Sequence, residues 1–157
     1  MRVGCPALAA GMARGYRSSS MPEPPRSRSL VLILAKDLAS RLATPTLVVD
    51  ADGVLVYFNE AAESVLGTTY ADSGLHDYQD LAKTFRPQDD DGNPMPLKEL
   101  PLTVAVVQRK PAHGTFSIVA SDGVHRKLAA TSLPLFAHQD ELVGAISVFW
   151  ERQDGEL

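Results

Sequence analysis

The residues of this chain that could perform chemistry are one acidic cluster, four scattered histidines and a single cysteine. The segment Asp89-Asp90-Asp91-Gly92-Asn93 has the composition of a calcium-binding loop. With Gly92 at the sixth loop position, however, Pro87 falls at the first position and Lys98 at the twelfth, where a bidentate glutamate is required. The segment therefore predicts a solvated turn, because carboxylates beside Gly and Asn are common in turns.

A second candidate metal site consists of Asp72, His76 and Asp80, which recur four residues apart. On one face of a helix they could serve as ligands for a hard metal. A lone histidine among surface acids is more often simply hydrated, and the helical pattern around these residues is weak. We therefore expect no metal site.

Motifs for catalysis are absent from the sequence. It contains no Gly-x-Ser-x-Gly, no His-Glu-x-x-His and no glycine-rich phosphate loop, and Cys5 has no candidate partner. We therefore expect the protein not to be an enzyme. The enzymatic alternative is a small α+β active site in which His113 or His125 acts as a base.

Composition limits the remaining classes of function. At 157 residues and 45% apolar composition, the chain can bury one core. A net charge of −4 gives no general attraction to nucleic acid or to an anionic membrane. The longest apolar run, residues 30–35, is too short to cross a bilayer. Because Cys5 cannot form an internal disulfide, we expect a cytoplasmic protein.

Residues 1–28 differ in composition from the rest of the chain. Gly, Ser, Arg and Pro dominate, and no periodic apolar pattern is present, so we predict a disordered tail. Its arginines and the lack of an acidic residue before Glu23 resemble an organelle transit peptide. We favour either a disordered tail or a start codon that has been assigned too far upstream, in which case Met21 is the initiator.

From Ser29 onward the pattern predicts elements of secondary structure. An amphipathic helix is expected in residues 29–44, with one apolar face made of Leu30, Ile33, Leu34, Leu38 and Leu42. Strands are expected at residues 46–51 and 54–58, joined in a hairpin by Asp52-Gly53. Asn59 then caps a short helix that ends at Gly67.

The second half of the chain predicts one more helix and three strands. Pro101 suits the first turn of a helix that runs to about Arg109. Strands are expected at residues 114–120, 124–136 and 142–151, with turns between them. The pattern is that of an α+β domain, a five-stranded antiparallel sheet with short helices on one face.

Three segments resemble the PAS domain, a sensory module of bacterial signalling proteins. They are the strand-Asn-helix-Gly unit at 51–67, the Asp-Gly-x-Pro turn (91–94) before the Pro101-Leu102 helix, and the final hairpin. In that hairpin, Ser-Leu-Pro-Leu-Phe (132–136) precedes the turn and Val143-Gly144 opens the last strand. The resemblance implies a flanking helix at 29–44, a sensor domain at 45–152 and a tail at 153–157.

Strand parity, aligned on the PAS pattern by Gly123 and Pro134, divides the sheet residues between two faces. The inner face and the Pro101 helix would supply a ligand-binding set: Leu47, Val49, Val104, Val107, Phe116, Ile118, Leu128, Ala130, Ser132, Ser147 and Phe149. Whether these residues line a cavity or simply fill a core stays open.

The outer face would carry Ile146, Val148 and Trp150. Such an apolar stripe has to be covered either by the N-terminal helix or by a second subunit. With Leu30, Ile33 and Leu34 of that helix, these residues form the predicted dimer or partner face. The resemblance also allows the helix to do either, so both interpretations stay open.

The resemblance also bears on cofactors. Flavin-binding members of the family use a cysteine that attacks the flavin, whereas this chain has none after Cys5, and Ile118, Leu128 and Phe149 replace their flavin-contacting amides. Haem-binding members commonly use a histidine on the helix before the third strand. Residues 96–109 contain no histidine, and His113 lies just beyond in an expected loop. We therefore expect neither flavin nor haem, and an unidentified small apolar ligand or none.

The sequence shows no kinase, cyclase or DNA-binding segment, and about five residues follow the last predicted strand. The leading hypothesis is therefore a stand-alone PAS-type sensor that binds a small molecule and signals through a homodimer or a separate effector. The alternative is a ligand-free PAS module whose output is dimerisation or partner docking.

Overall fold

The computed structural model describes residues 29–153. The predicted tail at residues 1–28 and residues 154–157 of the predicted C-terminal tail lie outside the described residues.

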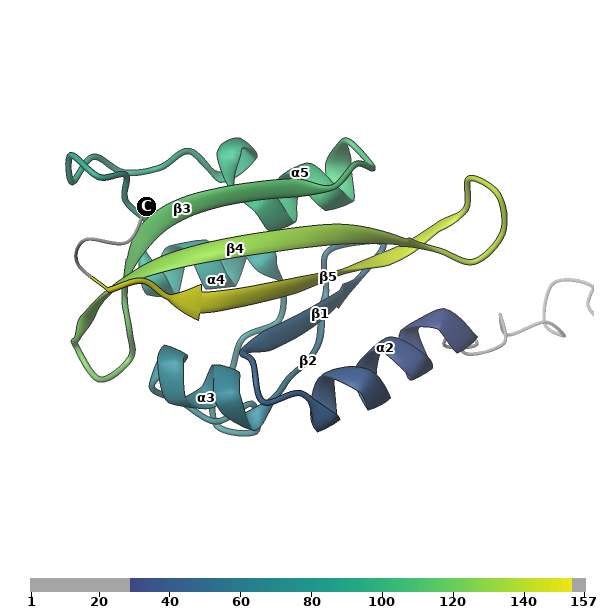
Figure 1. The fold of residues 1–157 in the computed structure, drawn as a ribbon, viewed down its shortest axis with the longest axis horizontal. Coiled ribbons are helices and arrows are strands. Elements are labelled where there is room, and N and C mark those ends of the chain that lie inside the picture. The colour runs from purple at the N-terminus through teal and green to yellow at the C-terminus, as the bar shows by residue number, and fades with distance from the viewer. Residues whose placement is uncertain (1–28, 154–157) are drawn as a thin grey trace, which may run out of the picture.

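The predicted five-stranded antiparallel sheet is confirmed. Its strand order is β2-β1-β5-β4-β3, so the first and last strands pair side by side near its middle (Figure 1). The strands are β1 (Thr46–Asp50), β2 (Leu55–Phe58), β3 (Ala112–Val119), β4 (His125–Phe136) and β5 (Leu142–Glu151).

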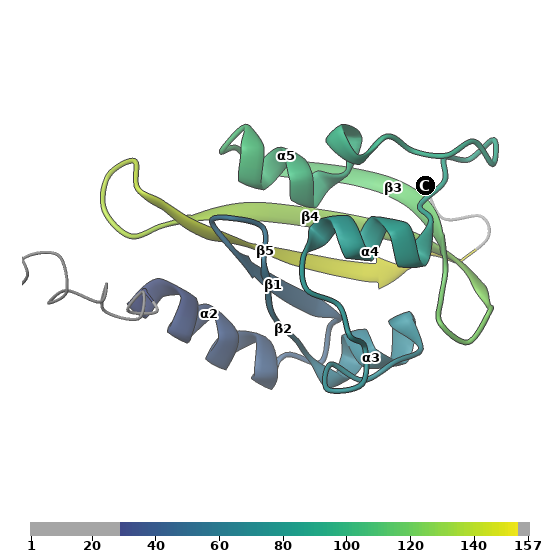
Figure 2. The same ribbon diagram turned by 180° about the vertical axis from the view of Figure 1, so that it is seen from behind.

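Helices cover both faces of this sheet (Figures 1 and 2). On the inner face lie α3 (Glu60–Leu66), α4 (Tyr78–Phe85) and α5 (Pro101–Val107), with a short 3₁₀ turn, η1 (Leu97–Glu99), before α5. On the outer face lies α2 (Leu30–Arg41). The predicted fold class is confirmed, with the N-terminal helix on the side of the sheet opposite to the other three.

The helix α3 forms where the sequence predicts it and for the predicted reason. The side-chain oxygen of Asn59 accepts a hydrogen bond from the backbone N–H of Ala62 at 2.9 Å, which caps the first turn. Gly67 ends the helix in the left-handed conformation, with φ 75°, and its N–H donates to the carbonyl oxygen of Glu63. This unit carries Ala62 and Leu66 into the inner core.

The packing of α2 differs from the expected apolar stripe. The buried residues of the helix are Leu32, Ala35 and Ala39, whereas Leu30 is 68% exposed and Leu34 is 58% exposed. The small alanines let the helix backbone approach the sheet closely. The larger side chains Leu30, Ile33, Leu34 and Leu38, called the leucine ridge below, all lie exposed on α2.

This packing corrects the prediction for Ile146. That side chain is 8% exposed and belongs to the cluster in which Leu32, Ala35 and Ala39 pack against the outer face of β1 and β5. It cannot be part of an open partner face, because α2 of the same chain already covers it.

The helix α4 supplies the helical turns that the sequence only suggested. Asp77 caps it by accepting a hydrogen bond from the N–H of Asp80 at 2.9 Å, and Asp80 in turn accepts one from the N–H of His76. These two carboxylates are thereby engaged in local backbone contacts. Within residues 29–153 there is no group of three side chains that could hold a metal ion.

The acidic segment forms the predicted turn. The carboxylate of Asp89 accepts hydrogen bonds from the N–H groups of Asp91 and Asn93, each at 2.9 Å. Such side-chain to backbone bonds are ordinary turn chemistry. In the same described part of the chain, no helix has the length and apolar character needed to span a membrane.

Candidate functional site

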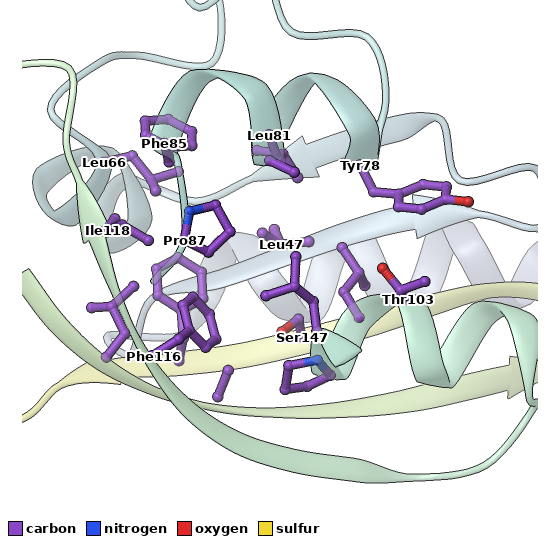
Figure 3. Close-up of a pocket in the computed structure, with 17 residues that line it drawn as sticks. Leu47, Leu66, Tyr78, Leu81, Phe85, Pro87, Thr103, Phe116, Ile118 and Ser147 are labelled. Carbon is purple, nitrogen blue, oxygen red and sulfur yellow. The ribbon is translucent and has the colours of Figure 1, made fainter. Parts of the chain in front are cut away.

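A cavity of about 90 Å³ lies between the inner face of the sheet and helices α4 and α5 (Figure 3). Its walls are mostly apolar, as is usual for a small-molecule site. The lining residues are Leu47, Leu66, Tyr78, Leu81, Ala82, Phe85, Pro87, Leu100, Pro101, Leu102, Thr103, Phe116, Ile118, Leu128, Ala130, Ser147 and Phe149.

The sheet supplies one wall, and it does so with residues that strand parity selected. Each of the strands β1, β3, β4 and β5 turns alternate side chains toward the cavity. The predicted ligand-binding residues that line it are Leu47, Phe116, Ile118, Leu128, Ala130, Ser147 and Phe149.

Two further predicted residues are buried next to the cavity without lining it. Val49 is fully buried in the inner core. Ser132 is also fully buried, and its hydroxyl donates a hydrogen bond to the hydroxyl oxygen of Ser147 at 2.8 Å. Ser132 therefore orients a cavity residue instead of facing the cavity itself.

The prediction that Val104 and Val107 of α5 line the cavity is wrong. Val107 is 64% exposed, and Val104 is only partly buried and does not line the cavity. The helix instead buries Pro101 with Ala105, one turn apart, and the neighbouring pair Thr103 and Val106. The helix packs against β4, β5 and β3, with the Pro101 ring next to Gly114 of β3. In this orientation Val104 and Val107 do not line the cavity.

The sequence interpretation missed the contribution of α4. Tyr78, Leu81, Ala82 and Phe85 all line the cavity. They stand at positions i, i+3, i+4 and i+7, directly after the cap residue Asp77. That spacing behind an N-cap is the signal that could have identified them.

A glycine in the β1–β2 turn makes room for the Tyr78 ring. Gly53 has φ 81°, and a Cβ atom placed on it would overlap two carbon atoms of that ring. The backbone N–H of Tyr78 also donates to the carbonyl oxygen of Gly53 at 3.0 Å. The start of α4 is thus fixed to the hairpin turn, with Tyr78 at the cavity wall.

The polar atoms of the cavity belong to a few uncharged groups. Thr103, which is 6% exposed, is the residue with a buried side-chain hydroxyl that finds no hydrogen-bond partner within residues 29–153. Leaving such a group unpaired costs roughly 1–3 kcal/mol. In Figure 3 the Thr103 oxygen lies on the side of its side chain that faces the cavity.

The two histidines considered as bases lie away from the cavity. His113 belongs to β3 and not to the expected loop, and its ring nitrogen Nδ1 lies 2.7 Å from the hydroxyl of Thr131. Its ring also lies 6.0 Å from that of Trp150. His125, at the exposed start of β4, does not line the cavity either. Neither ring could act on a molecule in the cavity or ligate a haem there.

The predicted partner face is open in part. The leucine ridge is exposed, Trp150 is 40% exposed, and Val148 is half-buried. Val148 and Trp150 continue the outer-face alternation of β5 past the covered Ile146. An apolar surface therefore remains on the outer side of the molecule after α2 has packed.

Comparison with known proteins agrees with this architecture. The sequence model described as the PAS fold matches residues 36–151. No curated protein resembles the chain closely enough to count as a match.

Several solved structures are similar to the chain. The PAS domain of BvgS from Bordetella pertussis is 20% identical with a TM-score of 0.52, over 79% of this chain and 87% of that one. The PAS domain of nitrogen regulation protein NR(II) from Vibrio parahaemolyticus is 18% identical with a TM-score of 0.52, over 76% and 98%. The LOV domain of the blue-light activated histidine kinase EL346 from Erythrobacter litoralis is 16% identical with a TM-score of 0.56, over 71% and 97%.

At these identities the solved structures show a shared fold. The family match spans well over half of the chain and includes every strand of the sheet. The chain therefore belongs to the family of PAS-fold proteins.

Proposed function

We propose that this protein is a sensory module that binds a small apolar ligand in the inner cavity and signals through a homodimer. One observation carries the proposal: the inner face of the sheet, α4 and α5 line an apolar cavity, partly open to the surface, at the place where a filled core would otherwise lie. Pockets of this kind, lined by apolar side chains with few polar groups, are typical ligand sites.

The same two strands separate the cavity from α2. On β1, Leu47 lines the cavity and its neighbour Val48 packs under α2. On β5, Ser147 lines the cavity and Ile146 packs under α2. Leu47 pairs with Ser147, and the adjacent Val48 pairs with Ile146. A ligand that displaces the first pair would therefore also move the second pair, on which α2 packs.

The leucine ridge supports the dimer part of the proposal. Leu30, Ile33, Leu34 and Leu38 recur at spacings of three and four on α2, and all four are at least half exposed. A contiguous apolar ridge of this kind is typical of a protein–protein contact. A second copy, offering the same ridge and its Trp150, would be a self-complementary partner. We propose no nucleic-acid or membrane partner, in keeping with the net charge of −4, and a cytoplasmic location.

The ligand part is tested by native mass spectrometry of the protein purified from its host. We expect a copurifying small molecule whose removal changes the hydrogen exchange of α2 amides. Repeated ligand-free spectra together with a fully packed interior in a crystal structure would contradict the sensor.

The dimer part is tested by sedimentation and size-exclusion chromatography. Leu34→Glu and Trp150→Glu should each convert the dimer to a monomer, because a charge would be buried in the contact. Val107→Glu is the matched control, since Val107 is more exposed than either residue but lies on α5. A wild-type monomer, or an unchanged dimer in both variants, would point to a separate effector instead.

A second candidate function is a ligand-free interaction module. The observation that favours it is the cavity volume of about 90 Å³, which is modest. Flavin fits this cavity poorly, because Ile118, Leu128 and Phe149 offer no hydrogen bonds to a flavin edge. In the ligand-free case, sealing the cavity with Ala130→Leu should leave dimerisation and its regulation unchanged, whereas a sensor would lose its response.

A further inference from the structure

We propose that the ligand is a small uncharged molecule with one carbonyl or hydroxyl oxygen, and that the Thr103 hydroxyl donates a hydrogen bond to that oxygen. This inference rests on the proposed function, since it names the chemistry of a ligand for the same cavity. It is carried by the unpaired hydroxyl at the cavity wall.

Thr103 stands in the first turn of α5, at its third residue. A threonine in a helix commonly donates its hydroxyl to a carbonyl one turn earlier. Here it does not, and the buried oxygen Oγ1 has no partner within residues 29–153. A side chain that is more than nine-tenths buried and turned toward a cavity therefore holds a free donor.

A second hydroxyl lines the same cavity. Ser147 accepts a hydrogen bond from Ser132 at 2.8 Å, which leaves its own proton for a further acceptor. Figure 3 shows Thr103 and Tyr78 toward one end of the cavity and Ser147 nearer its middle, whereas Leu66, Phe85 and Ile118 lie toward the other end. The lining residues Thr103, Ser147 and Tyr78 carry hydroxyls, all outside the apolar end formed by Leu66, Phe85 and Ile118, which fits a molecule with a single polar end.

The lining excludes a charged ligand. No Asp, Glu, Lys, Arg or His is among the cavity residues. A carboxylate or ammonium group would lose its hydration there without gaining an opposite charge. Two hydroxyl donors are instead matched to an uncharged oxygen.

The volume sets the scale of the ligand. The cavity of about 90 Å³ is smaller than the engineered apolar cavity of about 150 Å³ that accepts benzene. A neutral molecule of the size of butanone is therefore a suitable probe. 2-Methylbut-1-ene, called methylbutene below, has the same shape with a methylene group in place of the oxygen, and propionate has a similar shape with a charge.

The test titrates these three probes into the wild-type protein and into Thr103→Val, followed by amide chemical shifts in NMR. We expect Thr103→Val to weaken butanone binding by about fivefold to tenfold and to leave methylbutene binding unchanged. Propionate should produce no shifts at the cavity. A butanone affinity that does not change in Thr103→Val, or propionate that binds as well as butanone, would overturn the inference.

A stability measurement keeps the test independent of probe affinity. Thr103→Val should not lower the Tm of the ligand-free protein, because it removes an unpaired buried hydroxyl at almost constant volume. Thr46→Val is the matched control: Thr46 is equally buried, but its hydroxyl donates to the carbonyl oxygen of Thr44 at 2.9 Å. That variant should lower the Tm. An equal loss in both variants would show that Thr103 has an internal partner and would refute the assignment.

Different results would contradict the proposed sensor function and the proposed role of Thr103. If methylbutene and butanone bind but Thr103→Val affects them equally, the cavity binds ligands and only the role of Thr103 is wrong. If neither probe shifts any cavity amide and no ligand copurifies, the proposed sensor function fails together with this inference.

Discussion

The side-chain nitrogen of Asn59 lies 2.9 Å from the carbonyl oxygen of Ala39, which precedes it by twenty residues in the chain. The same amide group also donates to the carbonyl oxygens of Leu42 and Thr44. Its oxygen accepts from the N–H groups of Ala62 and Thr46. One buried side chain therefore ties the end of α2 to the start of β1 and the start of α3.

Replacing Asn59 should show that it contributes more to stability than an ordinary helix cap does. Asn59→Ala should lower the free energy of unfolding by about 3 kcal/mol or more, because several buried backbone groups lose their partner. Asn59→Ser keeps a cap oxygen and should recover about 1 kcal/mol of that loss. Urea denaturation measures both. Asp77→Ala, which removes only the cap of α4, is the control, and an Asn59→Ala loss no larger than that of the control would contradict this account.

Close packing of β1 beside β5, with Leu32 of α2 above them, makes Gly144 a sensitive position. A Cβ atom on Gly144 would overlap the carbonyl oxygen of Val49 and lie 2.8 Å from a methyl carbon of Leu32. Gly144→Ala should therefore destabilise the protein by about 3 kcal/mol and speed hydrogen exchange in α2. In β3, Gly114→Ala meets only the Pro101 ring at 3.2 Å and should cost less. Equal losses in the two variants would show that Val49 and Leu32 do not pack tightly against Gly144.

Gly53 does not line the cavity but contacts the ring of Tyr78, which does. Gly53→Ala has to displace the Tyr78 ring and should alter the amide shifts of cavity residues. Gly92→Ala is a matched control, because Gly92 has nearly the same φ, 83° against 81°, and no atom lies within 4 Å of its added Cβ. In both variants the left-handed backbone conformation should lower the free energy of unfolding by about 1 kcal/mol, because alanine disfavours it. Cavity shifts that are no larger in Gly53→Ala than in Gly92→Ala would exclude a role for this contact.

The strand part of the site could be predicted from the sequence, because side chains alternate between two faces with a period of two. Phe116, Ile118 and Leu128 followed from that rule once their strands were located. The turn at Asp122-Gly123 and the Asn59 cap fixed the strand and helix boundaries nearby. These features depend on local geometry, which a single sequence records well.

The side of α2 and of α5 that packs against the sheet could not be predicted. Where every position of a segment is apolar, hydrophobicity does not distinguish one side of the helix from another. Residues 30–35 are all apolar, so the leucines gave a clear period without showing which side met the sheet. The alanines Ala35 and Ala39 took that side since they permit closer packing. In α5 the same ambiguity favoured Val104 and Val107, whereas the helix buries Pro101 and Ala105.

A surface ion pair gives a prediction that depends on pH. The Arg126 guanidinium donates to both oxygens of Asp122, each at 3.1 Å, and lowers the pKa of that carboxyl below 3.8. Because the pKa is lower in the folded than in the unfolded chain, this contact stabilises the fold above about pH 4 and is lost as the pH falls through the lowered value. Arg126→Gln should move the pKa of Asp122 back toward 3.8 in a carboxyl NMR titration.

Two features make that titration decisive. The N–H of Val124 also donates to Asp122, so the return should be partial. Glu151→Gln removes a carboxylate 4.0 Å from Arg126 without touching Asp122 and should leave the pKa of Asp122 close to the wild-type value. A pKa of Asp122 that stays the same in Arg126→Gln would show that the ion pair does not persist in solution.

The pairing of β1 with β5 constrains the order in which the protein can fold during synthesis. Leu47 of β1 pairs with Ser147, so the middle of the sheet joins segments about a hundred residues apart. On the ribosome, β1 and β2 are complete long before β5 emerges. The inner core, which needs Ala145 and Phe149, cannot close until then. The nascent hairpin must therefore remain soluble with its apolar faces uncovered, which makes translation speed and chaperone access relevant to the yield of this small domain.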